Sequence, residues 1–318
     1  MALNWEAVLQ IVQMALVVAL APGLTGLVRK IKARLVGRIG APIHQPYRDI
    51  ARLLRKEAIV ADTTSWLFRA APYLVFAAIW VAASLVPTFS TDLLLHPAAD
   101  MIALIALLGA ARFFLALAGM DAGTSFGGLG SSREMMIASL AEPAMLMMVF
   151  TLALIAGTTS LSSIATYMLT HDPELRVSLG FALLATLIIA IAENARIPVD
   201  NPATHLELTM VHEAMVLEYS GRHLALIELA AALKLLLYVS LIACVFVPWG
   251  LATPGSSGSA LLIGGITYIG KLALGGVVLA CFETAIAKMR LFRVAEFLGG
   301  ALLFALIAAI LYFVTRSF

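Results

Sequence analysis

Several ionisable side chains lie inside long apolar stretches of this 318-residue sequence, where membrane hydrocarbon would surround them. Besides Arg112, they include Glu142, Glu193, Glu228, Lys234, Lys271 and Glu283. Moving a charged group to the centre of a bilayer costs roughly 2.5–3.5 kcal/mol on insertion scales, so such residues usually serve a function. Because both signs are present, we expect paired networks that face the interior of a helix bundle and pass protons along a path. The alternative is that the pairs only neutralise each other as contacts between helices.

The polar segment over residues 196–222 adds further carboxylates. We expect a helix over residues 203–219, because Thr204 with Glu207 three positions later fits a capping box. On that helix Glu207 and Glu218 share a face beside cytoplasmic water, which indicates a place where protons enter on their way to the membrane interior. The proton-path candidates are therefore Glu142, Glu193, Glu207, Glu213, Glu218, Glu228, Lys234, Lys271 and Glu283.

The same segment contains two histidines that could suggest a metal. His212 and Glu213 begin the HExxH zinc motif, but Val216 stands where the second histidine is required. His205 and His212 would lie about 10 Å apart on a helix, which is too far to share one metal without other ligands. With Tyr219 they instead form a stripe at a spacing of seven. We therefore expect no metal site and no catalytic centre in this chain.

The composition and the apolar runs of the chain indicate that these ionisable residues lie on transmembrane helices. Apolar residues make up 62% of the chain and charged residues 13%, and the mean hydropathy is +0.99. A soluble domain is about 25% charged. The apolar runs are continuous rather than alternating, so we expect an all-α integral membrane protein, a single domain over residues 1–318 with about eight transmembrane helices. The expected spans cover residues 5–28, 69–90, 98–118, 134–157, 177–196, 223–248, 261–284 and 294–315.

The distribution of lysine and arginine predicts how the helices are oriented. Loops at about 29–69, 119–133, 196–222 and 285–293 lie on one side and hold 16 of the 21 basic residues. By the positive-inside rule this side is cytoplasmic, and both termini lie on the opposite side. The net charge of only +2 leaves no basic footprint for nucleic acid.

The cytoplasmic loop over residues 29–69 is longer and more basic than topology alone requires. Ile50, Leu53 and Leu54 follow helical spacing within residues 49–57, which predicts an amphipathic helix near the membrane interface. Residues 125–133 are rich in glycine without the ending of a phosphate-binding loop, and we expect a flexible contact loop there. These loops either fix the topology or dock a soluble partner. The docking candidates are Arg38, Gln45, Asp49, Arg55, Lys56, Arg133, Asp200, His205 and His212.

Three long segments resemble the family of complex I membrane subunit 1, over essentially the full length of the chain. They are residues 38–57 (RIGAPIHQPYRDIARLLRKE), 130–143 (GSSREMMIASLAEP) and 193–221 (ENARIPVDNPATHLELTMVHEAMVLEYSG). The third segment departs from complex I at Val199, where that family has phenylalanine. Its residues 202–212 are similar instead to the membrane subunit of group 4 membrane-bound nickel–iron hydrogenases, such as formate hydrogenlyase.

The resemblance implies a membrane subunit that docks a cytoplasmic [NiFe] hydrogenase module to a membrane arm and couples its electron transfer to ion translocation. The implied partners are hydrogenase-like large and small subunits, an iron–sulfur ferredoxin-like subunit and antiporter-like membrane subunits in the cytoplasmic membrane of a prokaryote. The [NiFe] centre and [4Fe-4S] clusters are expected in those partners. An iron–sulfur cluster normally needs four thiolates, and this chain has only Cys244 and Cys281.

Three alternatives to the hydrogenase role stay open from the sequence. The first is the quinone-site subunit of an NADH:quinone oxidoreductase of the complex I type. The second is a stand-alone ion-coupled transporter, although the sequence lacks the inverted repeat that transporters use. The third is a purely structural anchor.

Overall fold

The chain folds into a bundle of helices. The computed structural model describes residues 5–91, 93–170, 177–200, 210–253, 255–287, 289 and 293–316. Seven helices in these ranges are long and apolar enough to cross a membrane: α1 (Trp5–Leu35), α3 (Trp66–Leu85), α4 (Met101–Asp121), α5 (Ser125–Ala156), α9 (Gly221–Phe246), α10 (Gly258–Ala285) and α11 (Val294–Arg316). An eighth apolar helix, α7 (Val177–Glu193), stands where the fifth span is predicted but has only 17 residues. Extended pairing in the described ranges is limited to two isolated bridges. The predicted all-α membrane fold is confirmed, with seven candidate spans instead of about eight.

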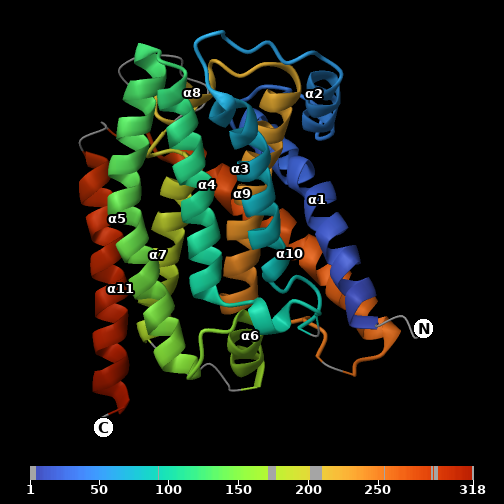
Figure 1. Cartoon of the computed structure of the whole chain (residues 1–318). Coiled ribbons are helices and arrows are strands. Elements are labelled where there is room, and N and C mark those ends of the chain that lie inside the picture. Colours follow the sequence, from blue (N-terminus) through green and yellow to red (C-terminus); the bar gives the residue numbers. More distant parts are fainter. Residues whose placement is uncertain are drawn as a thin grey trace.

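The bundle is built around α9 (Figure 1). In their apolar windows α9 is 67% buried, whereas α10 is 22% and α11 is 28% buried, so α9 is central and the other two are peripheral. α9 packs mainly on α3 and α1, while α5 packs on α4, α7 and α11. Figure 1 shows α1 starting and α11 ending at the lower end of the bundle, opposite the end that carries the short helices α2 (Gln45–Leu54) and α8 (His212–Val216).

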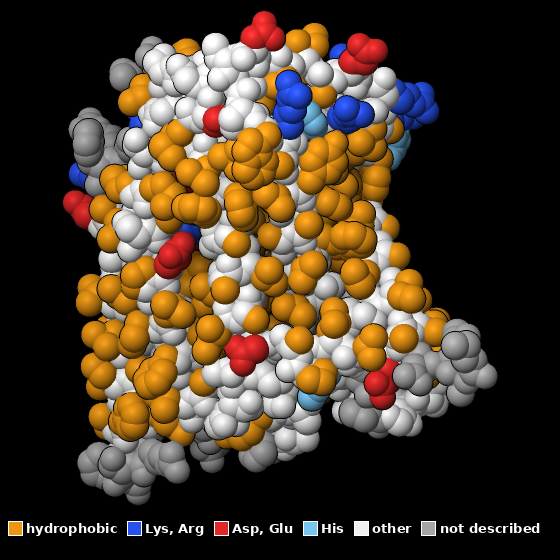
Figure 2. Space-filling view, in the orientation of Figure 1, with side chains coloured by type: hydrophobic (Ala, Val, Ile, Leu, Met, Phe, Trp, Pro, Cys, Tyr) orange, Lys and Arg blue, Asp and Glu red, His pale blue; other side chains and the backbone are white. Residues whose placement is uncertain are grey.

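The surface supports a membrane setting for this bundle. Figure 2 shows, on the face in view, a broad belt of hydrophobic side chains across the middle of the molecule. Most Lys and Arg side chains in this view lie at the end that carries α2 and α8, whereas acidic side chains are also visible within the belt and at the opposite end. Exposed tryptophans flank the belt, Trp66 at the start of α3 and Trp5 and Trp249 toward the other end. Tryptophan is enriched where a membrane meets water, so these residues indicate the two interfaces.

Two short helices surround the spans. α2 corresponds to the predicted amphipathic helix, although it begins at Gln45 because Pro46 suits a first helical turn. Its Tyr47 donates a hydrogen bond of 2.5 Å from Oη to the carbonyl of Ala19, next to Pro22 inside α1. α6 (Leu161–Thr170) packs on α5 and α9 and was not expected from the sequence.

The glycine-rich segment over residues 125–133 is helical, so the prediction of a flexible loop there is wrong. The hydroxyl of Thr124 caps α5 by accepting a hydrogen bond of 3.2 Å from the amide of Gly127. A Cβ on Gly127 would lie 2.1 Å from the carbonyl oxygen of Gly119, and one on Gly130 would lie 2.9 Å from that of Val211. The glycines therefore let α5 approach the end of α4 and the segment before α8.

This packing gives a matched pair of substitutions at neighbouring positions. Gly127→Ala is expected to lower the melting temperature of the detergent-purified protein, because its Cβ collides with main chain and overpacking costs about 1–3 kcal/mol. Gly128→Ala adds the same atom where nothing lies within 4 Å, so helix propensity should hold or raise the melting temperature. Equal melting temperatures for the two variants would contradict this account of the close approach.

The predicted helix over residues 203–219 is also wrong for its described part. α8 covers only His212–Val216, and a turn follows at residues 217–218. Gly221 begins α9 with a φ of +52°, and a Cβ there would lie 2.2 Å from the carbonyl oxygen of Glu57. The loop before α3 therefore packs directly against the first residue of α9. Thr204, His205 and Glu207 lie outside the described residues, so the capping box and its carboxylate row stay predictions.

Candidate ion network in the membrane interior

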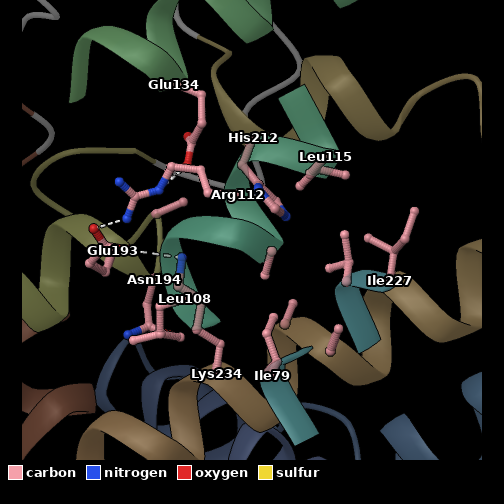
Figure 3. Close-up of a pocket in the computed structure, with 15 residues that line it drawn as sticks. Ile79, Leu108, Arg112, Leu115, Glu134, Glu193, Asn194, His212, Ile227 and Lys234 are labelled. Atoms are coloured by element: carbon pink, nitrogen blue, oxygen red, sulfur yellow. Dashed lines mark hydrogen bonds and ion pairs between the residues drawn. The ribbon is translucent and has the colours of Figure 1, made fainter. Parts of the chain in front are cut away.

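A buried arginine in the middle of α4 is the centre of an ion network (Figure 3). Its side chain is 4% exposed and contacts three carboxylates. Nε of Arg112 lies 3.6 Å from Glu134 and Nη1 lies 3.4 Å from Glu142, both on α5. Nη2 bonds to Oε1 of Glu193, the last residue of α7, whose other oxygen lies 3.0 Å from Nζ of Lys234 on α9. Four helices thus meet at one set of charges.

The sequence places these groups by simple helical geometry. Glu134 and Glu142 are eight residues apart on α5, about two turns, so both can lie beside the arginine of the neighbouring α4. Glu193 ends α7, and the chain turns at Ala195, whose φ is +47°. This turn leaves the Glu193 carboxylate at the end of the helix, where it reaches both cations.

The network holds one more carboxylate than cations. Glu134, Glu142 and Glu193 face only Arg112 and Lys234, so the fully ionised set has a formal charge of −1. Charges interact more strongly in a low-dielectric interior than in water, and an unbalanced buried charge is costly. Binding of one proton would bring the formal charge of the set to zero.

A cavity of about 70 Å³ adjoins the network. Apolar side chains such as Ile79, Leu108 and Ile227 line one part of it, and Arg112 and His212 line another (Figure 3). A water molecule needs about 10–15 Å³ of such space together with polar partners, so this cavity has room for several waters. His212 is a docking candidate from the sequence, but its place in the structure favours a role beside the network.

A second ion cluster lies near the cytoplasmic ends that the sequence predicts for α1 and α10. Glu283 has a side chain that is 1% exposed, and Oε2 lies 2.5 Å from Nζ of Lys32. Its Oε1 lies 3.4 Å from Nη1 of Arg196, which follows the turn at the end of α7. Glu283 was predicted as part of one proton path, and the structure places it in this separate cluster.

The structure distributes the other predicted residues more widely. Lys271 donates a hydrogen bond of 2.5 Å to the carbonyl of Val247 at the end of α9, which is a typical use of lysine at a helix C-terminus. Glu218 and Glu228 are exposed, and Glu213 is half-buried on α8. Of the nine proton-path candidates, the network contains Glu142, Glu193 and Lys234.

The docking candidates divide into two groups. At the end that carries α2, Arg38, Arg55 and Lys56 are exposed, whereas Gln45 and Asp49 are half-buried and bond to each other at 3.1 Å. Arg133 and Asp200 face inward. Arg133 donates a hydrogen bond of 2.7 Å to the carbonyl of Met210, and Asp200 is buried.

Sequence reasoning missed two members of the network, Arg112 and Glu134. Arg112 carried a signal, because it is the one basic residue in the apolar run of α4. Glu134 lies at the edge of its expected span and carried none. Within the described residues, no group of three or more His, Cys, Asp or Glu side chains could hold a metal ion.

These features define the class of the protein: an all-helical, multi-pass membrane protein with an ion network buried among its spans. A family model described as NADH dehydrogenase matches residues 7–314. The chain therefore belongs to this family, which is that of complex I subunit 1.

Individual relatives narrow the comparison. Formate hydrogenlyase subunit 4 of Escherichia coli (strain K12) is 33% identical over 281 residues, which are 88% of this chain and 90% of that protein. Hydrogenase-4 component C of the same strain is 33% identical over 90% of each chain. NADH-quinone oxidoreductase subunit 8 of Rhodothermus marinus is 26% identical over 77% of this chain and 74% of that protein.

A solved structure supports the fold. A chain from the membrane-bound sulfane sulfur reductase (MBS), described as an archaeal respiratory membrane complex, superposes with a TM-score of 0.81 over 95% of this chain and 97% of that chain. The two sequences are 18% identical, so this likeness concerns the fold alone. The chain is a multi-pass membrane protein related to bacterial hydrogenase subunits.

Proposed function

We propose that this chain is the membrane subunit of a hydrogenase-type complex in a prokaryotic cytoplasmic membrane. It docks a cytoplasmic [NiFe] module at the end that carries α2 and α8, and its ion network is part of the path that couples electron transfer to proton translocation. The observation that carries the proposal is the set of three carboxylates around Arg112 and Lys234 in the membrane interior. Charges in such a place are usually functional.

The relatives favour a hydrogenase over a quinone reductase as the redox partner. Two hydrogenase components match at 33% identity over about 90% of the chain, whereas the NADH-quinone oxidoreductase subunit matches at 26% over 77%. Large and small hydrogenase-like subunits and a ferredoxin-like subunit are therefore the proposed soluble partners, and they hold the metal centres.

The surface at the end that carries α2 supports docking there. Exposed basic residues, among them Arg38, Arg55 and Lys56, lie beside exposed apolar side chains such as Ile39 and Ile59. Apolar side chains among charges are typical of an interface with another protein. In the proposed orientation this end faces the cytoplasm and both termini face away from it, as the positive-inside rule requires.

Glu142 supports a second neighbour within the membrane. It lies near the middle of α5, and its side chain is 45% exposed at the outer face of the bundle. In contact with lipid a charged side chain at this depth costs about 2.5–3.5 kcal/mol. Coverage by another membrane subunit, of the proposed antiporter-like kind, removes that contact and continues the proton path.

Purification of the native complex through a tag on this chain tests the proposal. We expect nickel and iron to co-purify and the complex to evolve hydrogen, and we expect proteoliposomes that contain it to move protons during turnover. Quinone reduction with iron and flavin but no nickel would assign the chain to the complex I role instead. Purification of the chain alone, with ion transport of its own, would contradict any redox role.

A further inference from the structure

A second cavity, of about 160 Å³, lies between α1, α2 and α9. It shares no lining residue with the network cavity, which lies along other residues of α9. Its lining residues are Pro22, Thr25, Arg29, Pro46, Asp49, Ile50, Leu53, Glu228 and Ala232. At about 10–15 Å³ for each water, the space is large enough for a small chemical group rather than a single solvent molecule.

The position of this cavity opens it to the membrane interface. α1 and α2 form one edge of the bundle (Figure 1), and α2 packs on α1 and α9. Arg29 begins the basic last turns of α1, where the helix leaves the apolar layer, and Pro22 lies about two turns deeper. The cavity therefore reaches from the level of lipid headgroups into the hydrocarbon.

Two contacts hold α2 and the segment before it against α1, beside the cavity. Tyr47 on α2 bonds to the carbonyl of Ala19 on α1. A Cβ on Gly26 would lie 2.0 Å from the carbonyl oxygen of Ile43, so this glycine lets the segment before α2 lie directly on α1. The cavity is thus held open by a stable contact between two elements.

Two of its three charged side chains, Arg29 and Glu228, have no hydrogen-bond or ion-pair partner among the described residues. Both side chains are exposed. Asp49 uses only Oδ1, toward Gln45 and Arg52, within the same part of the chain. One cation and one carboxylate therefore face the same cavity without neutralising each other.

Arg29 also stands in an excess of positive charge. Burial lowers the pKa of Arg196, the Glu283 carboxylate opposes that change, and the positive charge of Arg29 adds to the lowering. Two guanidinium groups thus repel each other near the cavity. An anionic group bound at Arg29 would relieve this repulsion.

We propose that the cavity binds the headgroup of a zwitterionic aminophospholipid of the phosphatidylethanolamine class. The phosphate lies at Arg29, and the ammonium group lies at Glu228 and the free oxygen of Asp49. The acyl chains leave along the apolar lining into the bilayer. This site is independent of the proposed function, because it requires neither a hydrogenase partner nor a proton path.

Other membrane amphiphiles fit the charges less well. An anionic phospholipid satisfies Arg29 but brings negative charge toward Glu228. A quinone carries no charge and leaves both side chains unpaired beside hydrocarbon, which is unfavourable. A headgroup with both signs neutralises the pair, and a primary ammonium, unlike the quaternary ammonium of choline, can also donate hydrogen bonds to Glu228 and Asp49.

Lipid analysis of the native complex tests this site. The complex is purified in mild detergent through a tag on this chain, and bound lipids are quantified by mass spectrometry for each mole of complex. We expect Arg29→Gln/Glu228→Gln to lose a single phosphatidylethanolamine that the wild type retains. The matched control is Glu6→Gln/Arg69→Gln, which removes one glutamate and one arginine that are exposed outside the cavity and have no proposed role, and it should keep that lipid.

A measurement on the wild type keeps the test decisive if the double variant does not assemble. Delipidated wild-type complex is incubated in turn with phosphatidylethanolamine and phosphatidylglycerol of the same chain length, and retained lipid is counted by native mass spectrometry. Preference for phosphatidylethanolamine supports the site. Equal retention of the two lipids, preference for phosphatidylglycerol, unchanged lipid in the double variant, or a quinone in place of lipid would each overturn it.

Discussion

Arg112→Met is expected to lower the stability of the protein by about 3–5 kcal/mol, the usual cost of removing one partner from a buried ion pair. Without the guanidinium, three carboxylates would surround a site that keeps only the Lys234 cation. The two anions on α5 and the anion at the end of α7 would repel one another within a low dielectric. The melting temperature of the purified protein and the yield of assembled complex in the membrane measure this loss.

Two variants give this prediction its controls. Arg112→Lys keeps a positive charge but cannot contact three carboxylates with a planar fork, so we expect an intermediate melting temperature. Lys271→Met removes another cation from a membrane span, but its loss frees only the carbonyl of Val247 and should cost much less. Arg112→Met with the melting temperature of Lys271→Met would mean that the network contributes little to the fold.

Glu193→Gln is expected to abolish proton translocation while the complex still assembles. The amide has the size of the carboxylate, and its carbonyl oxygen can still accept the hydrogen bond from Arg112, while its NH2 then faces Nζ of Lys234 and is expected to lower the melting temperature without preventing assembly. The remaining carboxylates, Glu134 and Glu142, then match Arg112 and Lys234 in number, so the set no longer has a spare negative charge for a proton. Proton uptake by proteoliposomes, divided by the redox turnover of the same sample, measures the coupling.

The controls for Glu193→Gln separate position from charge. Glu218→Gln changes an exposed carboxylate outside the network and should leave the ratio of protons to turnover unchanged. Glu134→Gln removes the same charge from another place in the network and should also lower the ratio. Loss of assembly in Glu193→Gln would mean that this carboxylate is structural, and an unchanged ratio would remove the network from the proton path.

The spans were predictable because the bilayer leaves a chain few choices. Backbone groups in hydrocarbon must be satisfied within the same helix, so an apolar run of about 20 residues indicates where a helix crosses. The ends were less predictable, since α1 continues to Leu35 through polar residues that periodicity does not assign to the membrane. The helix over residues 125–133 was missed because glycine indicates a loop until its close neighbours are known.

The network was predictable only as a set of candidates. Glu193 and Lys234 carried the signal of charge within an apolar run, but Lys271 carried the same signal and bonds instead to a main-chain carbonyl. Which charges meet depends on how α4, α5, α7 and α9 pack, and α7 and α9 are far from the consecutive helices α4 and α5 in the sequence. Partner choice is therefore a property of tertiary packing and cannot be obtained from spacing along one helix.

The short turn after α7 constrains how the sequence of this region can vary during evolution. Glu193 and Arg196 are three residues apart, yet the first belongs to the Arg112 network and the second to the Glu283 cluster. The main chain between them is held by hydrogen bonds from the amides of Ala195 and Arg196 back to α7. A replacement that moves one cluster therefore displaces the other through the same peptide units. Substitutions at the two clusters are therefore expected to occur together in related sequences. Glu193, Arg196 and the turn between them should vary as one group.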